Sequence, residues 1–194
     1  MEKWADYKNE FLSGLASLSA TDSADAEIAL DKAFRLWLKW TRTVGVKNRS
    51  VFIIGNGASA SIASHIAADA IKKGYLKAYV FNDPTLLTAI GNDEQFSEVF
   101  SLPLERIGRP GDMLISISSS GNSPNIVKAL ESARKLQMTL VTLSGMTPHN
   151  RSRSLGNLNF HIPSSRYGWI ESAHQLIMHH WLDQYLNLYG KGAD

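Results

Sequence analysis

The sequence predicts an α/β fold in which helices cover both faces of a central parallel sheet. From residue 51 onward, short apolar runs alternate with segments of helical periodicity, which is the pattern of strands connected by helices. Five runs have the length and composition of buried strands: VFIIG at 51–55, KAYVF at 77–81, MLISIS at 113–118, TLVTLSG at 139–145 and NFHIP at 159–163. Ligands of such sheets bind at the carboxyl ends of the strands, in the loops that lead into helices.

Helices are expected between these strands and ahead of them. The segments that connect or follow the strands are 59–73, 85–106, 123–136 and 168–189. Residues 4–18 form a first helix, and a second reaches about Val44 after the polar break SATDSADAE, which could supply its cap. The second helix is apolar on several faces, which indicates contacts between subunits as well as within one. We expect one domain over residues 1–194, with 1–48 used in oligomerisation and 49–190 as the α/β core.

Composition excludes several classes of function. The absence of cysteine removes disulfides, thiol catalysis and thiolate metal sites, and it is consistent with a reducing cytoplasm. A net charge of +2 without a dense basic block argues against a nucleic-acid surface. The charged N-terminus does not resemble a secretory signal, and no apolar run approaches the roughly 20 residues that span a bilayer. We therefore expect a cytoplasmic protein with no membrane or nucleic-acid partner.

Two junctions between a strand and the following helix could bind an anion. The first is Gly55-Asn56-Gly57-Ala58-Ser59, where glycine lets backbone N–H groups approach a ligand at a helix N-terminus. Gly-Asn-Gly is also common as a plain tight turn. The dinucleotide fingerprint is absent because Ala60 occupies the third glycine position, and the Walker pattern does not follow either.

The second junction is the serine-rich segment 118–124, directly after the strand MLISIS. Ser123 is a suitable N-cap, and Pro124 suits the first position of a helix. Serines are ordinary loop residues as well. Yet hydroxyls clustered at a carboxyl strand end can bind phosphate oxygens together with the partial positive charge of a helix N-terminus. This junction is the better candidate for a phosphate site.

The two junctions in this order, GNGAS and SISSSGNS with AIGNDEQF between them, resemble the sugar isomerase (SIS) domain. The chain is most similar to phosphoheptose isomerases, which interconvert sedoheptulose 7-phosphate and D-glycero-D-manno-heptose 7-phosphate. The resemblance implies a flavodoxin-like three-layer sandwich and a homotetramer with active sites at subunit interfaces. It implies that the phosphate is held by Ser118, Ser119, Ser120 and Ser123, and that the sugar side of the pocket is shaped by Asn56, Gly57 and Ser59. It also places Asn92 and Asp93 close to the substrate.

Two pairs of polar residues could form a reaction centre. His65 and Asp69 are four residues apart and share one face of the helix that begins at the first junction. Glu171 and His179 lie about 80° apart around the last helix, away from the apolar stripe expected to pack on the sheet. His149 and His161 are expected to be structural, whereas His174 and His180 could be core or surface groups.

The resemblance assigns these pairs a joint role. Phosphoheptose isomerases carry a His and a Glu on the first of these helices and a Gln and a His on the last, and in some members the four bind zinc. His65 and His179 match, whereas Asp69 replaces the Glu and Glu171 replaces the Gln. Two imidazoles and two carboxylates are suitable ligands for a tetrahedral Zn²⁺. Zn²⁺ is therefore the expected cofactor, with His65, Asp69, Glu171 and His179 as ligands.

The same residues would carry out the chemistry. Aldose–ketose isomerisation moves a proton between C1 and C2 through an enediol or enediolate, so it needs a base and an acid. By the family pattern Asp69 is the base and His179 the acid, and Glu171 is an alternative base. Two further positions depart from the family: Lys73 stands where it has Arg, and Gly168 stands where some members have a catalytic Asp. Lys73 keeps the charge near the substrate but not the bidentate geometry.

Three functions remain open. The first is an isomerase of seven-carbon sugar phosphates that supplies heptose for lipopolysaccharide, capsule or a related glycoconjugate. The second is a non-catalytic SIS protein similar to the DnaA initiator-associating factor, which regulates replication initiation. That regulator lacks the acid and the histidine that Asp69 and His179 supply here, although LLTAIGND and the altered acid positions depart from the enzyme pattern. The third is a sugar-phosphate-sensing domain of a transcription regulator, but no helix-turn-helix segment accompanies it.

Overall fold

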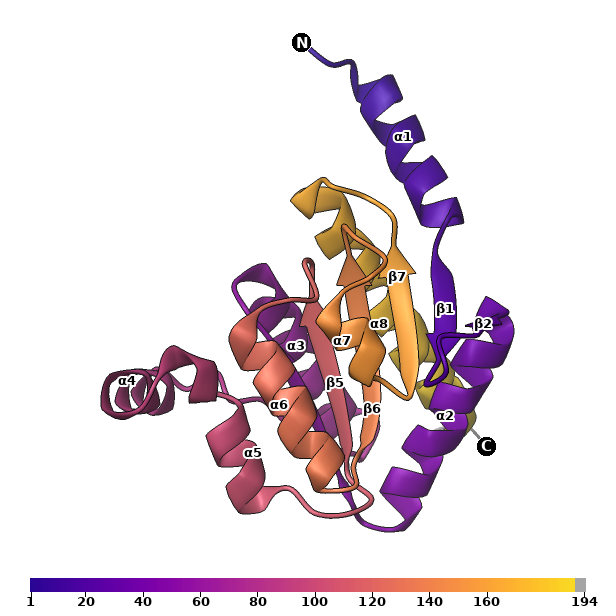
Figure 1. Ribbon diagram of the computed structural model, residues 1–194. Coiled ribbons are helices and arrows are strands. Elements are labelled where there is room, and N and C mark those ends of the chain that lie inside the picture. Colours follow the sequence, from indigo (N-terminus) through magenta and orange to yellow (C-terminus); the bar gives the residue numbers. More distant parts are fainter. Residues whose placement is uncertain (191–194) are drawn as a thin grey trace.

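The computed structural model describes residues 1–190, and within them helices cover both faces of a seven-stranded sheet (Figure 1). Residues 191–194 of the predicted domain lie outside the described residues. The strand order is β2-β1-β7-β6-β5-β3-β4. Five neighbouring strands are parallel: β3 (Ser50–Gly55), β4 (Lys77–Tyr79), β5 (Met113–Ser118), β6 (Thr139–Gly145) and β7 (Leu158–Ile162). They confirm the five predicted strands, and their spatial order is that of flavodoxin.

The remaining two strands correct the prediction for the polar break. β1 (Ser19–Asp22) pairs antiparallel with β7, and β2 (Glu27–Ile28) pairs antiparallel with β1. The break does not cap the next helix, because the N-cap is Ala29 and makes no side-chain hydrogen bond. Instead Asp22 Oδ1 accepts hydrogen bonds from the backbone N–H groups of Ala24 and Ala26, which stabilises the turn. So short a strand leaves little periodicity, and it forms because β7 offers an unpaired edge.

One face of the sheet is covered by the three longest helices. They are α2 (Leu30–Val46), α3 (Ala58–Lys72) and α8 (Tyr167–Tyr189). The rings of Trp37 on α2 and Trp181 on α8 stack at 4.8 Å between centroids, and both residues are fully buried. The indole N–H of Trp181 donates to Thr41 Oγ1 at 3.0 Å, so this core has a specific polar contact as well as apolar packing. The packing fixes α8 against the sheet, and α8 carries two of the predicted site residues.

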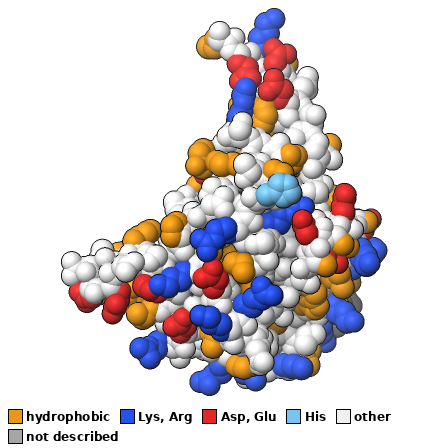
Figure 2. Space-filling view, viewed as in Figure 1, with side chains coloured by type: hydrophobic (Ala, Val, Ile, Leu, Met, Phe, Trp, Pro, Cys, Tyr) orange, Lys and Arg blue, Asp and Glu red, His pale blue; other side chains and the backbone are white. Residues whose placement is uncertain are grey.

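The other face is covered by α5 (Ser101–Ile107), α6 (Pro124–Lys135) and α7 (Arg151–Leu155), which Figure 1 shows in front of the sheet. A separate apolar cluster fills this side, with Phe52, Leu114 and Ile126 among its buried members. The three-layer sandwich is therefore confirmed. Over this face, Lys and Arg side chains are mixed with Asp and Glu side chains (Figure 2), consistent with a net charge of only +2.

The single helix predicted over 85–106 is wrong. The segment forms α4 (Pro84–Asp93), a 3₁₀ turn (Phe96–Glu98) and α5. The backbone leaves the helical region at Glu94 and Gln95, directly after Gly-Asn-Asp, three residues with low helix propensity. The break lets α4 extend away from the body of the molecule, as Figure 1 shows.

The first helix also projects from the body. α1 (Trp4–Ala16) extends beyond the sheet in Figure 1, and none of its residues is buried. It is attached by the rings of Tyr7 and Phe11, which pack edge-on against Trp169, and by a bidentate pair between Arg166 and Glu2 just before the helix, with N–O distances of 2.9 and 3.0 Å. A role of residues 1–48 in oligomerisation stays a prediction.

Among residues 1–190, no helix is both long and apolar enough to cross a membrane.

Candidate active site

The site lies where the direction of the strand order reverses. β3 and β5 are adjacent parallel strands, with Gly55 paired to Ile117 near their carboxyl ends. The chain leaving β3 enters α3 on one face of the sheet, whereas the chain leaving β5 enters α6 on the other. Such a divergence opens a crevice in which ligands of open α/β sheets bind. The two junctions selected from the sequence are therefore brought together.

A cavity of about 210 Å³ occupies this position, and we call it the serine pocket. All four serines predicted to hold phosphate line it, together with Asn56 and Ser59. The complete lining is Asn56, Ser59, Ile117, Ser118, Ser119, Ser120, Ser123, Tyr167 and Glu171. Gly57 is absent from this lining. The pocket thus joins residues from both junctions with the start of α8.

The lining of the serine pocket supplies hydroxyl groups, the Asn56 amide and, at one side, the Glu171 carboxylate, and it contains no basic side chain. Ser118 and Ser119 are buried, with 6% and 8% of their surface exposed. Ser123 precedes α6 but its side chain makes no capping hydrogen bond, which leaves that hydroxyl free to meet a ligand. The N-terminus of the 12-residue helix α6 adds a partial positive charge. An anion such as phosphate suits this arrangement.

Glycines make both junctions possible. A Cβ on Gly55 would lie 2.7 Å from backbone and side-chain atoms of Ser59, so only glycine permits this close approach. Gly57 has φ 55° and ψ −123°, a conformation that residues with a side chain rarely adopt. On the second junction Gly121 has φ 64°, and a Cβ there would lie 2.1 Å from Asn150 Oδ1. The loops are shaped by these glycines before any ligand arrives.

A pair of amides locks the two junctions to each other. Asn56 Nδ2 donates to Asn125 Oδ1 at 3.0 Å, and Asn125 Nδ2 donates to Asn56 Oδ1 at 2.9 Å. Asn125 is buried in the first turn of α6, and its own Oδ1 also accepts from the backbone N–H of Ile126. This reciprocal contact fixes the position of Asn56 in the wall of the serine pocket.

A second cavity of about 490 Å³ lies between α3 and α8, and we call it the α3–α8 groove. Its lining comes from one face of each helix: Ala58, Ser61, Ile62, His65, Gly168, Glu171, Ser172 and Gln175. Glu171 lines both the groove and the serine pocket. The two cavities therefore meet at this carboxylate.

The predicted reaction-centre residues lie on these two helices. The His65 and His179 ring centroids are 5.4 Å apart, which brings α3 and α8 together as expected. Asp69 Oδ2 lies 3.8 Å from His65 Nε2, and Asp69 Oδ1 lies 3.6 Å from Lys73 Nζ. Within the described part of the chain, no three His, Asp or Glu side chains are close enough together to hold a metal ion.

Four predicted substrate residues line neither cavity: Gly57, Lys73, Asn92 and Asp93. Asn92 and Asp93 are exposed at the end of α4, where Asn92 Nδ2 donates to Asp93 Oδ1 at 2.8 Å. Lys73 is exposed at the end of α3 and pairs with Asp69. Their roles toward the substrate stay predictions.

The cavities also have lining residues that were not predicted from the sequence: Ile117, Tyr167, Ser61, Ser172 and Gln175. Helical spacing is the sequence signal that could have found those on the helices. Positions 58, 61, 62 and 65 share one face of α3, and positions 168, 171, 172 and 175 share one face of α8.

The histidines outside this centre fall into two groups. His174 is fully buried with Nε2 3.2 Å from the Ser144 carbonyl oxygen, and burial lowers its pKa to about 4. His161 is buried in β7, and burial together with the nearby Arg153 charge lowers its pKa. Both are neutral at pH 7, as suits structural groups. His149 and His180 are exposed, and the His180 ring packs edge-on against Phe34.

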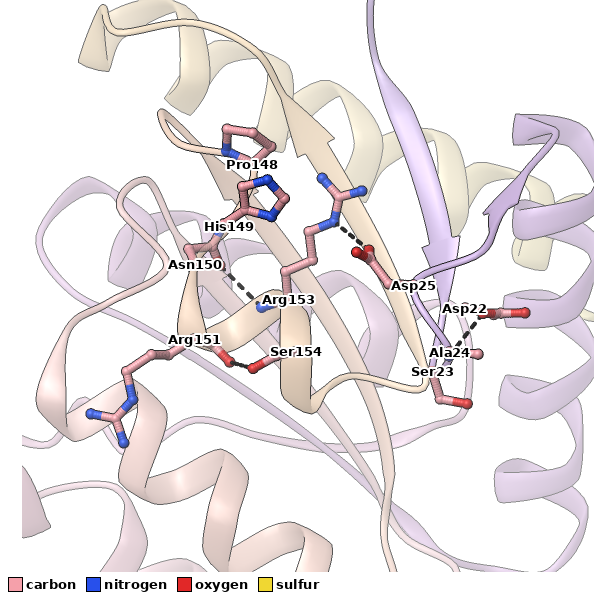
Figure 3. Close-up of a pocket in the computed structure, with 10 residues that line it drawn as sticks. All are labelled: Asp22, Ser23, Ala24, Asp25, Pro148, His149, Asn150, Arg151, Arg153 and Ser154. Atoms are coloured by element: carbon pink, nitrogen blue, oxygen red, sulfur yellow. Dashed lines mark hydrogen bonds and ion pairs between the residues drawn. The ribbon is translucent and has the colours of Figure 1, made fainter.

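A further cavity of about 550 Å³ lies between the β1–β2 turn and α7 (Figure 3). Its charged side chains already have partners within the chain. Arg153 Nε lies 3.3 Å from Asp25 Oδ1, and Arg151 Nη2 donates to Glu131 Oε1 at 3.0 Å. Asp22 is engaged by the turn described above. The cavity lies beside β7, away from the point where β3 and β5 diverge, so it is separate from the candidate active site.

Comparisons with known proteins agree with this site. Residues 10–145 match the family model described as the SIS domain. The phosphoheptose isomerase of Aromatoleum aromaticum is 33% identical over 142 residues, which cover 69% of this chain and 72% of that protein. Among solved structures, phosphoheptose isomerase GmhA from Neisseria gonorrhoeae superposes with a TM-score of 0.81 at 28% identity, covering 93% of this chain and 96% of that one.

A phosphoheptose isomerase from Francisella tularensis gives a TM-score of 0.79 at 26% identity, covering 94% of this chain and 95% of that one. The alternative of a DnaA-binding regulator finds no support in these comparisons. Sequence similarity and fold point the same way, and the family model spans both loops that form the serine pocket. The chain therefore belongs to the SIS-domain family and, within it, to the phosphoheptose isomerases.

Proposed function

We propose that this protein is an aldose–ketose isomerase that converts sedoheptulose 7-phosphate to D-glycero-D-manno-heptose 7-phosphate, which supplies heptose for lipopolysaccharide, capsule or a related glycoconjugate. One observation carries the proposal: the serine pocket and the α3–α8 groove meet at Glu171. A phosphate held by the serines would leave its sugar chain in the groove, next to a carboxylate and an imidazole. These are the groups that proton transfer between neighbouring carbons requires.

The serine pocket would bind the phosphate without a basic side chain. Serine hydroxyls and backbone N–H groups donate to the phosphate oxygens, and the N-terminus of α6 favours negative charge. Glu171 is the only ionisable carboxylate in the lining. It would stand at the sugar side of the bound phosphate. Binding by fixed neutral donors selects the phosphate end and leaves the carboxylate for chemistry.

Glu171 is the better placed of the two candidate bases. It lines both cavities, whereas Asp69 lines neither and is engaged with His65 and Lys73. In this assignment Glu171 takes the proton from C1 of the ketose, and the carbonyl oxygen at C2 gains a proton from an acid. The resulting enediol loses its O1 proton and receives a proton at C2, which gives the aldose. His179, in contact with His65, is the proposed acid.

We also propose Zn²⁺ as the cofactor, with His65, Asp69, Glu171 and His179 as its candidate ligands. A Glu171 or His179 side chain bound to the ion would not serve as base or acid at the same time. The donor set fits zinc chemically, since two imidazoles and two carboxylates are suitable ligands. The proximity of His65 to both His179 and Asp69 supports the choice. Bound there, the ion would polarise the substrate carbonyl and stabilise negative charge on the enediolate oxygen.

The proposed assembly is a cytoplasmic homotetramer with active sites at subunit interfaces. Trp4 and Leu12 on α1 are 74% and 51% exposed, which is unfavourable for large apolar side chains left in water. Contact with a neighbouring subunit would cover them. It would also account for Asn92, Asp93 and Lys73 lying outside the two cavities of a single chain. Size-exclusion chromatography with light scattering tests the tetramer, and a monodisperse monomer would contradict it.

The activity is tested directly with purified protein and sedoheptulose 7-phosphate, with product formation followed by NMR. Metal content is measured before and after chelation, and the assay is repeated after Zn²⁺ is restored. Turnover that falls on chelation and returns with Zn²⁺ supports both the isomerase and the cofactor. Turnover that is unaffected by chelation would contradict the proposed Zn²⁺ cofactor but not the isomerase activity. No turnover after Zn²⁺ is restored would contradict the isomerase activity.

A further inference from the structure

Tyr167 lines the serine pocket, yet neither the phosphate site nor the reaction described above uses it. We propose that the Tyr167 phenol is a further phosphate-binding group, whose hydroxyl donates a hydrogen bond to the bound phosphate from the mouth of the pocket. The inference rests on the phosphate site of the proposed function. It adds to that site a residue that comes from α8 and not from the serine loop.

Three helices begin around the serine pocket, and Tyr167 is the first residue of one of them. α3 follows β3, α6 follows β5 and α8 follows β7, so all three start at the carboxyl edge of the sheet. The pocket is lined by Ser59 in the first turn of α3, by the N-cap residue Ser123 of α6 and by Tyr167 at the start of α8. Helix N-termini favour negative charge. The phosphate end of the substrate therefore belongs at the level of Tyr167.

The order of residues along α8 matches the order of groups along the substrate. Tyr167 and Glu171 are four residues apart, so their side chains share one face of α8 and start about 6 Å apart along its axis. Tyr167 lines the serine pocket alone, whereas Glu171 also lines the α3–α8 groove. With the phosphate beside Tyr167, the sugar chain runs toward Glu171, and its far end, C1 and C2, meets the carboxylate. Tyr167 is thus assigned to the phosphate and not to the reacting carbons.

The exposure of the lining residues places Tyr167 at the mouth of the pocket. Ser118 and Ser119 are buried and form the floor, whereas Tyr167 is 60% exposed. A phosphate on the floor can therefore meet the phenol from the opposite side. The phenol hydroxyl is a neutral donor, so it adds a hydrogen bond to the anion without a charge that would pair with Glu171. Hydrogen bonds to an ionised acceptor are the stronger kind.

The first turn of α8 is anchored on the side away from the pocket. Arg166 pairs with Glu2, and its guanidinium carbon lies 4.4 Å from the centre of the Trp169 ring. Trp169 is buried, and its backbone N–H donates to the Arg166 carbonyl oxygen at 3.1 Å. These contacts hold the backbone on both sides of Tyr167. Its side chain therefore starts from a fixed point at the edge of the pocket.

The test compares Tyr167→Phe with Tyr75→Phe, a matched change at a tyrosine that is 62% exposed and lines neither cavity. Each change removes only a hydroxyl at an exposed position, so both variants should fold. Calorimetric titration with inorganic phosphate should show roughly 10-fold weaker binding to Tyr167→Phe and unchanged binding to Tyr75→Phe. The KM for sedoheptulose 7-phosphate should rise by a similar factor in Tyr167→Phe. Its kcat should change little, because the phosphate contact is the same in the ground state and the transition state.

Inorganic phosphate that binds Tyr167→Phe as tightly as the wild type would overturn the inference. An equal loss of phosphate affinity in Tyr75→Phe would also overturn it, since the effect would then not be specific to the pocket. So would a fall in kcat without a change in KM, because the hydroxyl would then act at the reacting carbons.

Failure of the proposed function gives a different result, because phosphate binding is measured without turnover. A wild type that binds inorganic phosphate but does not convert sedoheptulose 7-phosphate contradicts the isomerase. Weaker phosphate binding by Tyr167→Phe still supports the role of Tyr167 in that case. A wild type that binds no inorganic phosphate would overturn the inference whatever its turnover.

Discussion

The serine pocket and the α3–α8 groove are neighbouring cavities built on different principles. The pocket is made by two loops whose backbones are held by glycines and by the reciprocal Asn56–Asn125 contact. The groove is made by side chains on two helices, and several of them, including His65 and Gln175, are exposed. A preorganised backbone suits an anchor that every substrate shares. Side chains on helix faces suit chemistry and specificity, because they can change without altering the fold.

The largest effect that would sharpen this contrast is expected from Glu171→Gln. It keeps the size of the side chain and removes the proposed base, so kcat should fall roughly 100- to 1000-fold while phosphate affinity stays. Asp69→Asn should reduce kcat less, because Asp69 lines neither cavity and its loss leaves the other three proposed zinc ligands in place. Steady-state kinetics of the two variants check this. Full activity in Glu171→Gln together with loss of activity in Asp69→Asn would show that Asp69, not Glu171, is the base.

A second effect concerns the support behind the serine loop. His174 hydrogen-bonds the Ser144 carbonyl, and the next residue, Gly145, donates its N–H to the Ser119 carbonyl at 2.9 Å. Because the folded-state pKa of His174 is about 4 and the unfolded value is 6.5, the unfolded state binds the proton more readily. The contribution of His174 to the free energy of unfolding is therefore fully present above about pH 6.5. It is lost as the pH falls toward 4, by up to about 3 kcal/mol.

Urea unfolding between pH 4 and pH 8 measures this dependence. His174→Gln removes the titrating group, so its stability curve should be flatter in this range than that of the wild type. Equal pH dependence in the two proteins would assign the loss to other groups, among which His161 also has a lowered pKa.

A third effect concerns the rigidity of the serine pocket. Gly121→Ala places a Cβ 2.1 Å from Asn150 Oδ1 at a residue with φ 64°, and it should cost about 2 kcal/mol of stability or more. Gly14→Ala is the control, because a Cβ there has no atom within 4 Å and alanine is favoured inside α1. Thermal unfolding compares them. A Gly121→Ala protein as stable as the wild type would show that the loop is not held rigidly.

The smallest effect is expected from single serine hydroxyls. Ser120→Ala removes one of several donors to the phosphate, so the KM for sedoheptulose 7-phosphate should rise roughly 10-fold with kcat little changed. Ser165→Ala is the matched control, being an exposed serine outside the pocket. Inhibition by inorganic phosphate should weaken in the first variant and not in the second. If inhibition weakened in Ser165→Ala and not in Ser120→Ala, the serine loop would not be the phosphate-binding site.

The sequence alone was sufficient for the parallel sheet and for the serine pocket. Both are local features: a buried strand is an apolar run of β-forming residues, and the loop after it needs glycines and hydroxyls at adjacent positions. Ser118, Ser119, Ser120 and Ser123 are therefore found in the pocket where they were expected. The family resemblance also predicted the four residues on α3 and α8, His65, Asp69, Glu171 and His179. Their spacing along each helix is a local feature of the sequence as well.

Only the tertiary structure decided which helix faces meet and where strands pair over long distances. β1 forms because β7 lies beside it, although the two are more than 130 residues apart in the chain. Gln175 is one of many polar residues on α8 until α3 is placed opposite it, and Glu171 becomes the better base only when the two cavities are seen to share it. Asn92 and Asp93 show the same limit in reverse, since α4 carries them away from both cavities. Contacts of this kind depend on packing between distant segments, and that packing leaves no periodic trace in either segment alone.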